Sequence, residues 1–134
     1  MLVEPENLEA AVANARSLLD AIVAGPLFQK LRSLAGSVVA RELPVLAPPE
    51  ADAGPAGYVS GTIDLLYRDP DSGELVVADY KTDRVPAEIA LTEHGRAYAH
   101  QGDAYRRAVR EAFALGYTPR FELWYLRRGE IVPV

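Results

Sequence analysis

Three ionisable residues lie in a part of the sequence that is otherwise rich in apolar residues. Asp64 is flanked on both sides by aliphatic residues, and Asp79 and Lys81 follow an apolar run. Side chains two apart in a strand project from the same face, so Asp79 and Lys81 are expected to lie side by side. Two partly buried carboxylates with one ammonium are unfavourable unless a cation or ligand satisfies them. Two carboxylates can bind Mg²⁺, which prefers oxygen ligands, and a lysine beside them can orient an attacking water. The pattern is therefore typical of metal-dependent hydrolysis.

A simpler interpretation of the same residues stays open at this point. An acid and a lysine two residues apart often occur by chance, and Asp79 and Lys81 could form a surface ion pair while Asp64 is solvated at a sheet edge. The apolar surroundings and the tight turn between the two segments favour the metal site. Glu42, on the preceding predicted strand, is a candidate third acid, and its alternative is a strand residue that faces solvent.

The elements that must position these residues can be predicted from periodicity and turn residues. Helical spacing of apolar residues, with a glycine after each segment, predicts helices over 7–24, 26–35 and 96–115. Alternation and β-branched residues predict strands over 37–47, 58–69, 74–82 and 120–134, the last with a turn at 128–129, and residues 48–57 are predicted to be a loop. The turn at 70–73 joins the two middle strands in an antiparallel hairpin. Asp64 and Asp79 lie at comparable distances from that turn, so their carboxylates can converge. The element order predicts an α/β (α+β) fold with a mixed central sheet flanked by helices.

Composition limits the class of protein and of site. The 134 residues carry a formal net charge of −5 and no cysteine, which excludes disulfides, thiolate zinc sites, cysteine nucleophiles and iron–sulfur clusters in this chain. No apolar run approaches the ~20 residues that cross a bilayer, and the acidic N-terminus lacks the basic start of a signal peptide. These features predict one domain over residues 1–134, cytoplasmic and without a membrane partner. The negative charge does not exclude nucleic acid, because a local groove can be basic. The arginines at 106, 107, 110, 127 and 128 are either a phosphate-binding patch or a solvated face.

The segments GTID (61–64) and DYKTD (79–83) resemble the metal-binding core of the PD-(D/E)xK nucleases, in their RecB-like branch. Gln101 and Tyr105 are similar to the Q-x-x-x-Y motif of that branch. Residues 21–45 are similar to its helix–helix–strand start, with Glu42 at the acidic position. The final segment, 121–134, resembles the last strands of the nuclease domain that closes AddA-type helicase–nuclease subunits.

The resemblance implies a restriction-endonuclease-like core, in which residues 1–36 form a helical N-terminal part and residues 37–134 form the catalytic core. It makes Asp64 and Asp79 metal ligands, together with the backbone carbonyl of Tyr80. Lys81 becomes the catalytic lysine, and Glu42 becomes an accessory acid near the metal.

Four further residues are implied to contact DNA or to support the active-site strand: Gln101, Tyr105, Thr82 and Arg84. Gln101 and Tyr105 are four residues apart on one helix face, so they can reach the site together. Their alternative is a tyrosine that packs on the sheet with the glutamine at the rim. Arg84 could bind a phosphate, or it could be a solvated loop arginine.

The activity implied by the resemblance is that of a Mg²⁺- or Mn²⁺-dependent deoxyribonuclease. In the family, such domains act on DNA beside a superfamily-1 helicase, in the same chain or complex, during double-strand break repair and recombination. An exonuclease is therefore expected. The alternatives are a catalytically silent nuclease-fold scaffold or DNA-binding module, and a small acidic binding module whose acid pair is coincidental.

One departure from the branch concerns histidine. Branch members carry a metal-ligating histidine on a helix ahead of the segment that this sequence covers, whereas His94 and His100 lie beside or within the later helix. We expect that the chain is a fragment of a longer helicase–nuclease that begins after that helix. The alternative is a site without this ligand.

Overall fold

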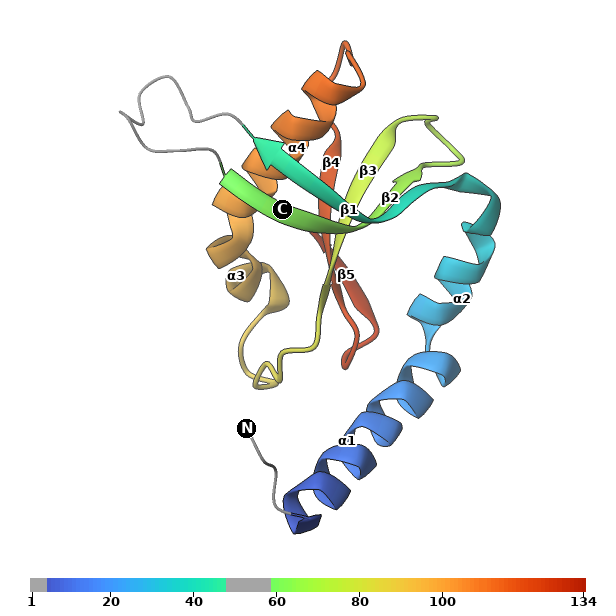
Figure 1. Ribbon diagram of the computed structural model, residues 1–134, viewed down its shortest axis with the longest axis vertical. Coiled ribbons are helices and arrows are strands. Elements are labelled where there is room, and N and C mark those ends of the chain that lie inside the picture. Colours follow the sequence, from blue (N-terminus) through green and yellow to red (C-terminus); the bar gives the residue numbers. More distant parts are fainter. Residues whose placement is uncertain (1–4, 48–58) are drawn as a thin grey trace.

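The computed structural model describes residues 5–47 and 59–134 (Figure 1). The helices are α1 (Pro5–Ala24), α2 (Pro26–Ser33), α3 (Leu91–Gly95) and α4 (Ala99–Ala112), with short 3-10 turns at Ala35–Ser37 and Arg96–Tyr98. The strands are β1 (Val38–Ala47), β2 (Val59–Arg68), β3 (Leu75–Lys81), β4 (Arg120–Tyr125) and β5 (Glu130–Pro133). The predicted helices and strands are thus confirmed in type and order, but α3 is an additional helix that begins within residues 84–92, which were predicted to be a loop. The predicted loop at 48–57 lies outside the described residues.

The five strands form one mixed sheet in the order β1-β2-β3-β4-β5. Strands β3 and β4 are parallel, and the other neighbouring pairs are antiparallel. The β2–β3 connection is the predicted tight turn, closed by the Gly73 N–H, which donates to the Asp69 carbonyl at 2.8 Å. Gly73 has φ 75, a conformation that favours glycine. The parallel connection from β3 to β4 requires a crossover, and α3 and α4 provide it.

Helices cover both faces of the sheet. On one face, α4 packs Tyr105 and Val109 against side chains of β2, β3 and β4. On the other face, Leu27 and Leu34 in and after α2 pack against a cluster that includes Trp124. Figure 1 shows α4 and α2 on opposite sides of the strands. The sheet is therefore buried on both faces at β3, the strand that carries Asp79 and Lys81.

The last predicted helix ends earlier than its glycine indicates. The sequence predicts an end at Gly116, but α4 ends at Ala112, and the left-handed residue after it is Ala114, with φ 51. The N–H of Leu115 donates to the Arg110 carbonyl at 2.9 Å, and that of Ala114 donates to the Glu111 carbonyl at 3.2 Å. These two bonds form a Schellman motif, which satisfies the free carbonyls of the last turn before the glycine is reached.

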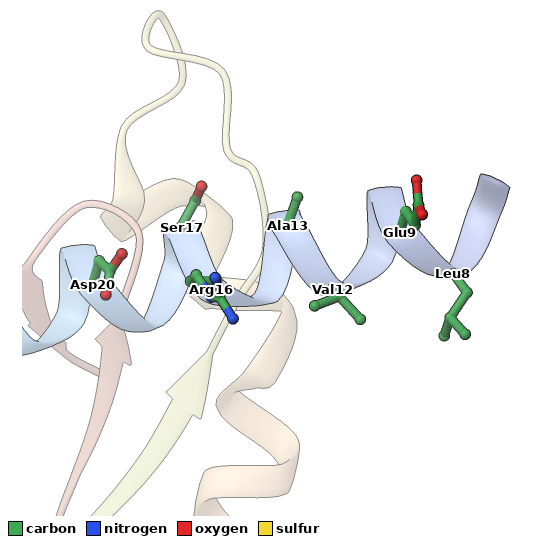
Figure 2. Close-up of a pocket in the computed structure, with 7 residues that line it drawn as sticks. All are labelled: Leu8, Glu9, Val12, Ala13, Arg16, Ser17 and Asp20. Atoms are coloured by element: carbon green, nitrogen blue, oxygen red, sulfur yellow. The ribbon is translucent and has the colours of Figure 1, made fainter. Parts of the chain in front are cut away.

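Helix α1 packs mainly against α2 and extends away from the sheet (Figure 1). Its apolar residues Leu8, Val12, Leu19 and Val23 are between 51% and 61% exposed. A shallow, open hollow of about 500 Å³ is lined by residues of this helix. Figure 2 shows Leu8 and Val12 on one side of the helix and Glu9, Ala13 and Ser17 on the other. The helical period that predicted α1 therefore does not bury an apolar face in this structure.

Within the described residues, no single helix is long and apolar enough to span a bilayer. The pair formed by residues 7–24 and α2 reaches that length and composition together but is bent by 59°.

Candidate active site

The sheet is irregular at two facing positions, Asp64 on β2 and Glu42 on β1, and these irregularities determine the direction of the Asp64 side chain. Ile63 packs in the cluster on the α4 face, whereas Leu65 packs in the cluster on the α2 face, although residues two apart in a regular strand share a face. The alternation of β2 is therefore interrupted at Asp64. Strand β1 has the matching irregularity at Glu42, which has φ 49 and lies between the pairs Arg41↔Leu65 and Leu43↔Ile63. A non-glycine residue in this conformation is uncommon and costly, and such strain is often found at functional sites.

The carboxylates of Asp64 and Asp79 lie beside each other at the end of the β2–β3 ladder. That ladder runs from Arg68↔Leu75 to Leu65↔Ala78, and Asp64 and Asp79 are the next residues on each strand. Beyond the last pair, the Oδ2 atom of Asp64 accepts the backbone N–H of Tyr80 at 2.7 Å. The Oδ2 atom of Asp79 lies 2.7 Å from Lys81 Nζ. The structure thus brings Asp64, Asp79 and Lys81 together.

Burial makes the charge of Asp79 unfavourable. The residue is only 7% exposed, and this burial raises the pKa of its carboxyl above the ordinary 3.8. The Lys81 ammonium opposes the rise, and the neighbouring Asp64 carboxylate adds to it. Lys81 pairs with Asp79, and Asp64 lies beside Asp79 as a second carboxylate, so the group has an excess of negative charge that a cation would compensate.

The donor set fits a divalent cation that keeps several of its waters. Mg²⁺ is usually bound through one or two carboxylates, and Asp64 and Asp79 supply two. The Lys81 carbonyl accepts the Leu126 N–H on the β4 side, and successive carbonyls of a strand alternate, so the Tyr80 carbonyl faces the Asp64 side. Within residues 5–47 and 59–134, no group of three histidine or acidic side chains has a geometry suited to a metal.

Glu42 lies across from Asp64 on β1, but its side chain is exposed. The structure does not bring it into a three-acid cluster with Asp64 and Asp79. The left-handed backbone at Glu42 changes the direction of its side chain relative to a regular strand. Its role as an accessory acid stays a prediction.

Tyr105 packs on the sheet from α4, and Gln101 of the same helix donates a hydrogen bond to its hydroxyl. Tyr105 is 4% exposed and packs edge-on against Phe121, and its hydroxyl accepts a hydrogen bond from Gln101 Nε2 at 3.1 Å. That hydroxyl also lies directly over Gly61, where an added Cβ would overlap it. This arrangement matches the alternative interpretation, a tyrosine packed on the sheet with the glutamine at its rim, and a DNA contact by either residue stays a prediction. It also explains why a glycine stands three residues before Asp64.

The segment after β3 leaves the site along the molecular surface. Thr82 and Arg84 are both exposed, and the Thr82 carbonyl accepts a hydrogen bond from Arg127 Nε at 2.6 Å. Arg128 donates to the carbonyls of Pro86 and Ile89, each at 3.3 Å. The arginines of the β4–β5 turn therefore hold this segment in place, and a phosphate contact by Arg84 stays a prediction.

An aromatic and acidic network that the sequence did not predict surrounds Lys81. Lys81 Nζ lies 3.7 Å from the centroid of the Tyr98 ring, and the Tyr98 hydroxyl donates to Asp83 Oδ2 at 3.0 Å. His94 Nε2 lies 3.4 Å from the same oxygen, and His94 Nδ1 lies 2.8 Å from the Tyr125 hydroxyl. The sequence held one signal for Tyr98. It stands three residues before Gln101, and this spacing places both side chains near one face of the same helix.

The geometry agrees with the comparison of the sequence with protein families. The family model of the PD-(D/E)XK nuclease superfamily matches residues 3–132. The chain belongs to this superfamily. The mixed five-stranded sheet with its helices is consistent with the restriction-endonuclease-like fold of PD-(D/E)XK nucleases, as the sequence predicted. The comparison with curated proteins found no match.

Proposed function

We propose that this PD-(D/E)XK chain is a metal-dependent deoxyribonuclease, which uses Asp64, Asp79 and Lys81 to hydrolyse the phosphodiester bonds of DNA. One observation carries the proposal: the buried Asp79 carboxylate, paired with Lys81, has the Asp64 carboxylate of the neighbouring strand beside it, in a chain that belongs to a nuclease superfamily. A surface ion pair explains Asp79 and Lys81 less well, because Asp79 is nearly buried and has a second carboxylate beside it.

Each residue has a defined task in this proposal. Asp64 and Asp79, with the Tyr80 carbonyl, would hold Mg²⁺ or Mn²⁺. When bound, such a cation polarises the phosphate and makes water more acidic. Lys81 places a positive charge where negative charge develops on the phosphate oxygens. The Tyr80 N–H fixes the orientation of the Asp64 carboxylate.

The cellular role that we propose is exonucleolytic processing of DNA beside a superfamily-1 helicase, in cytoplasmic double-strand break repair or recombination. The resemblance of residues 121–134 to the end of AddA-type nuclease domains supports this role. A motor that delivers the strand would reduce the need for strong intrinsic affinity for DNA, which is compatible with the net charge of −5.

The test is cleavage of linear duplex and single-stranded DNA, labelled at either end, by the 134-residue chain. We expect cleavage with Mg²⁺ or Mn²⁺ and none with excess chelator, and release of short products from one labelled end if the chain is an exonuclease. The Asp64→Asn variant should not cleave. The control variant, Asp71→Asn, changes an exposed residue at the opposite end of the same hairpin and should cleave as the wild type does. If the wild-type chain does not cleave under any of these conditions, that result contradicts the proposal for this chain and favours the silent scaffold.

A further inference from the structure

The Lys81 ammonium has two partners of different kinds. Asp79 Oδ2 lies 2.7 Å from Nζ, and the Tyr98 ring centroid lies 3.7 Å from it. The Lys81 side chain is only 14% exposed, so little solvent competes for the cation. The attraction between a cation and an aromatic face is strongest when the cation is desolvated.

Tyr98 is itself held in place from its other end. Its hydroxyl donates to Asp83 Oδ2 at 3.0 Å, and Asp83 follows Lys81 by two residues on the same segment. Burial raises the pKa of Tyr98, as does the hydrogen bond to the Asp83 carboxylate, so the hydroxyl stays protonated and able to donate. The His94 ring lies beside the Tyr98 ring, with centroids 5.8 Å apart, and also approaches Asp83. The ring therefore has a defined position at the start of α4.

The two partners of Lys81 differ in what competes for them. In the proposed function Asp79 must also serve a divalent cation, and a carboxylate oxygen shared with that cation attracts an ammonium less strongly. The face of Tyr98 is uncharged and takes no part in metal binding. It can therefore hold Lys81 when the ion pair to Asp79 is weakened.

We propose that Tyr98 is a positioning residue, whose ring keeps the Lys81 ammonium beside the acid pair when a metal is bound there. The consequence for catalysis rests on the proposed nuclease function, but the contact itself does not. Asp83 acts indirectly, because its carboxylate accepts the hydrogen bond that anchors the Tyr98 hydroxyl. The ring attracts the Lys81 ammonium, and the hydroxyl only anchors the ring. Tyr98→Phe should therefore keep most of the positioning of Lys81, and Tyr98→Leu should lose it.

The contact can be measured without any activity, by NMR of the metal-free and Mg²⁺-saturated protein. Protons over the face of an aromatic ring are shifted upfield, so the ε-methylene protons of Lys81 report on Tyr98. We expect an upfield shift in the wild type and in Tyr98→Phe, its persistence at saturating Mg²⁺, and its loss in Tyr98→Leu. Tyr117→Leu, which removes a half-buried tyrosine that bonds to Leu75 instead, should leave the shift unchanged. If Mg²⁺ abolishes the shift in the wild type, or Tyr98→Leu retains it, the proposal is overturned.

Steady-state cleavage then tests the catalytic consequence. Tyr98→Leu should lower kcat roughly tenfold or more with little change in KM, and Tyr98→Phe should recover most of kcat. A purely structural role for Tyr98 would lower the melting temperature and leave kcat of the folded enzyme unchanged, and that result would contradict the proposal. If wild type and variants all fail to cleave DNA while the NMR pattern is as expected, the nuclease function is wrong and the Tyr98–Lys81 contact stands.

Discussion

Asp64 accepts the backbone N–H of Tyr80 at 2.7 Å and thereby replaces a ladder hydrogen bond with one from its side chain. The β2–β3 ladder ends at Leu65↔Ala78, and this bond continues the connection between the strands by one further step. It orients one carboxylate oxygen of Asp64 and ties it to the residue between Asp79 and Lys81. The same side chain is thus part of the sheet and part of the candidate active site.

Substitutions of Asp64 should separate these two roles. Asp64→Asn keeps an oxygen that can accept the Tyr80 N–H, so its free energy of unfolding should stay close to that of the wild type while cleavage is lost. Asp64→Ala leaves that N–H without its partner and should lower the free energy of unfolding by about 1–3 kcal/mol as well. Urea unfolding and the cleavage assay check the two effects. Equal stability of the two variants would contradict a structural role for the Asp64–Tyr80 bond.

The buried carboxyl of Asp79 predicts an unusual dependence of stability on pH. Its pKa is raised in the folded state above the ordinary 3.8, so between 3.8 and that raised value the folded protein holds a proton that the unfolded chain releases. The contribution of Asp79 to stability is therefore full below pH 3.8 and is lost as the pH rises through the folded pKa. In the absence of metal, Asp79→Asn should gain stability over the wild type across this window. Urea unfolding of both proteins from acid to neutral pH measures the difference between their free energies of unfolding. A difference that does not change with pH would contradict the prediction.

Divalent cations should offset this penalty only in proteins that keep both Asp64 and Asp79. A ligand that binds only the folded state stabilises it by about 2.7 kcal/mol at a concentration 100 times its Kd. Mg²⁺ or Mn²⁺ should therefore raise the melting temperature of the wild type and of Asp71→Asn, and should have little effect on Asp64→Asn or Asp79→Asn. A metal-induced increase that survives both site substitutions would place the metal elsewhere.

Gly61 and Tyr105 should be energetically coupled across the β2–α4 contact. A Cβ atom at Gly61 would overlap the Tyr105 hydroxyl and crowd its ring, so Gly61→Ala should destabilise the protein by about 1–3 kcal/mol. Tyr105→Phe removes the hydroxyl and should recover part of that loss in the double variant. Gly36→Ala is the matched control, because no atom lies within 4 Å of the added Cβ there. Strict additivity of the Gly61 and Tyr105 substitutions would contradict the close contact.

Much of this fold and site could be predicted from the sequence because local signals were strong. The turn at 70–73 determines the hairpin, and the hairpin register places Asp64 and Asp79 next to each other. The spacing of Asp79 and Lys81 places both on one face of β3. These relationships depend on few residues, all near in sequence.

The rest depends on tertiary contacts that no local pattern encodes. The interruption of β2 at Asp64 and the left-handed Glu42 arise where two strands accommodate each other. Tyr98 approaches Lys81 only because the crossover helices return over the sheet. No local pattern places His94 beside the Tyr98 ring, and its sequence position suggested only a metal ligand at the wrong place. Helix α1 was predicted correctly, but its periodicity could not show that its apolar side chains would stay exposed.

The most direct test of the central claim is single-turnover cleavage of end-labelled linear DNA with Mg²⁺, compared among the wild type, Asp79→Asn, Lys81→Gln and Asp71→Asn. The account predicts that the wild type and Asp71→Asn cleave at equal rates. We expect Asp79→Asn and Lys81→Gln to be slower by about 100-fold or more, because Asp79→Asn weakens binding of the divalent cation and Lys81→Gln removes a positive charge that stabilises the transition state. Cleavage by Asp79→Asn or Lys81→Gln at the wild-type rate would show that the site is not where the chemistry occurs.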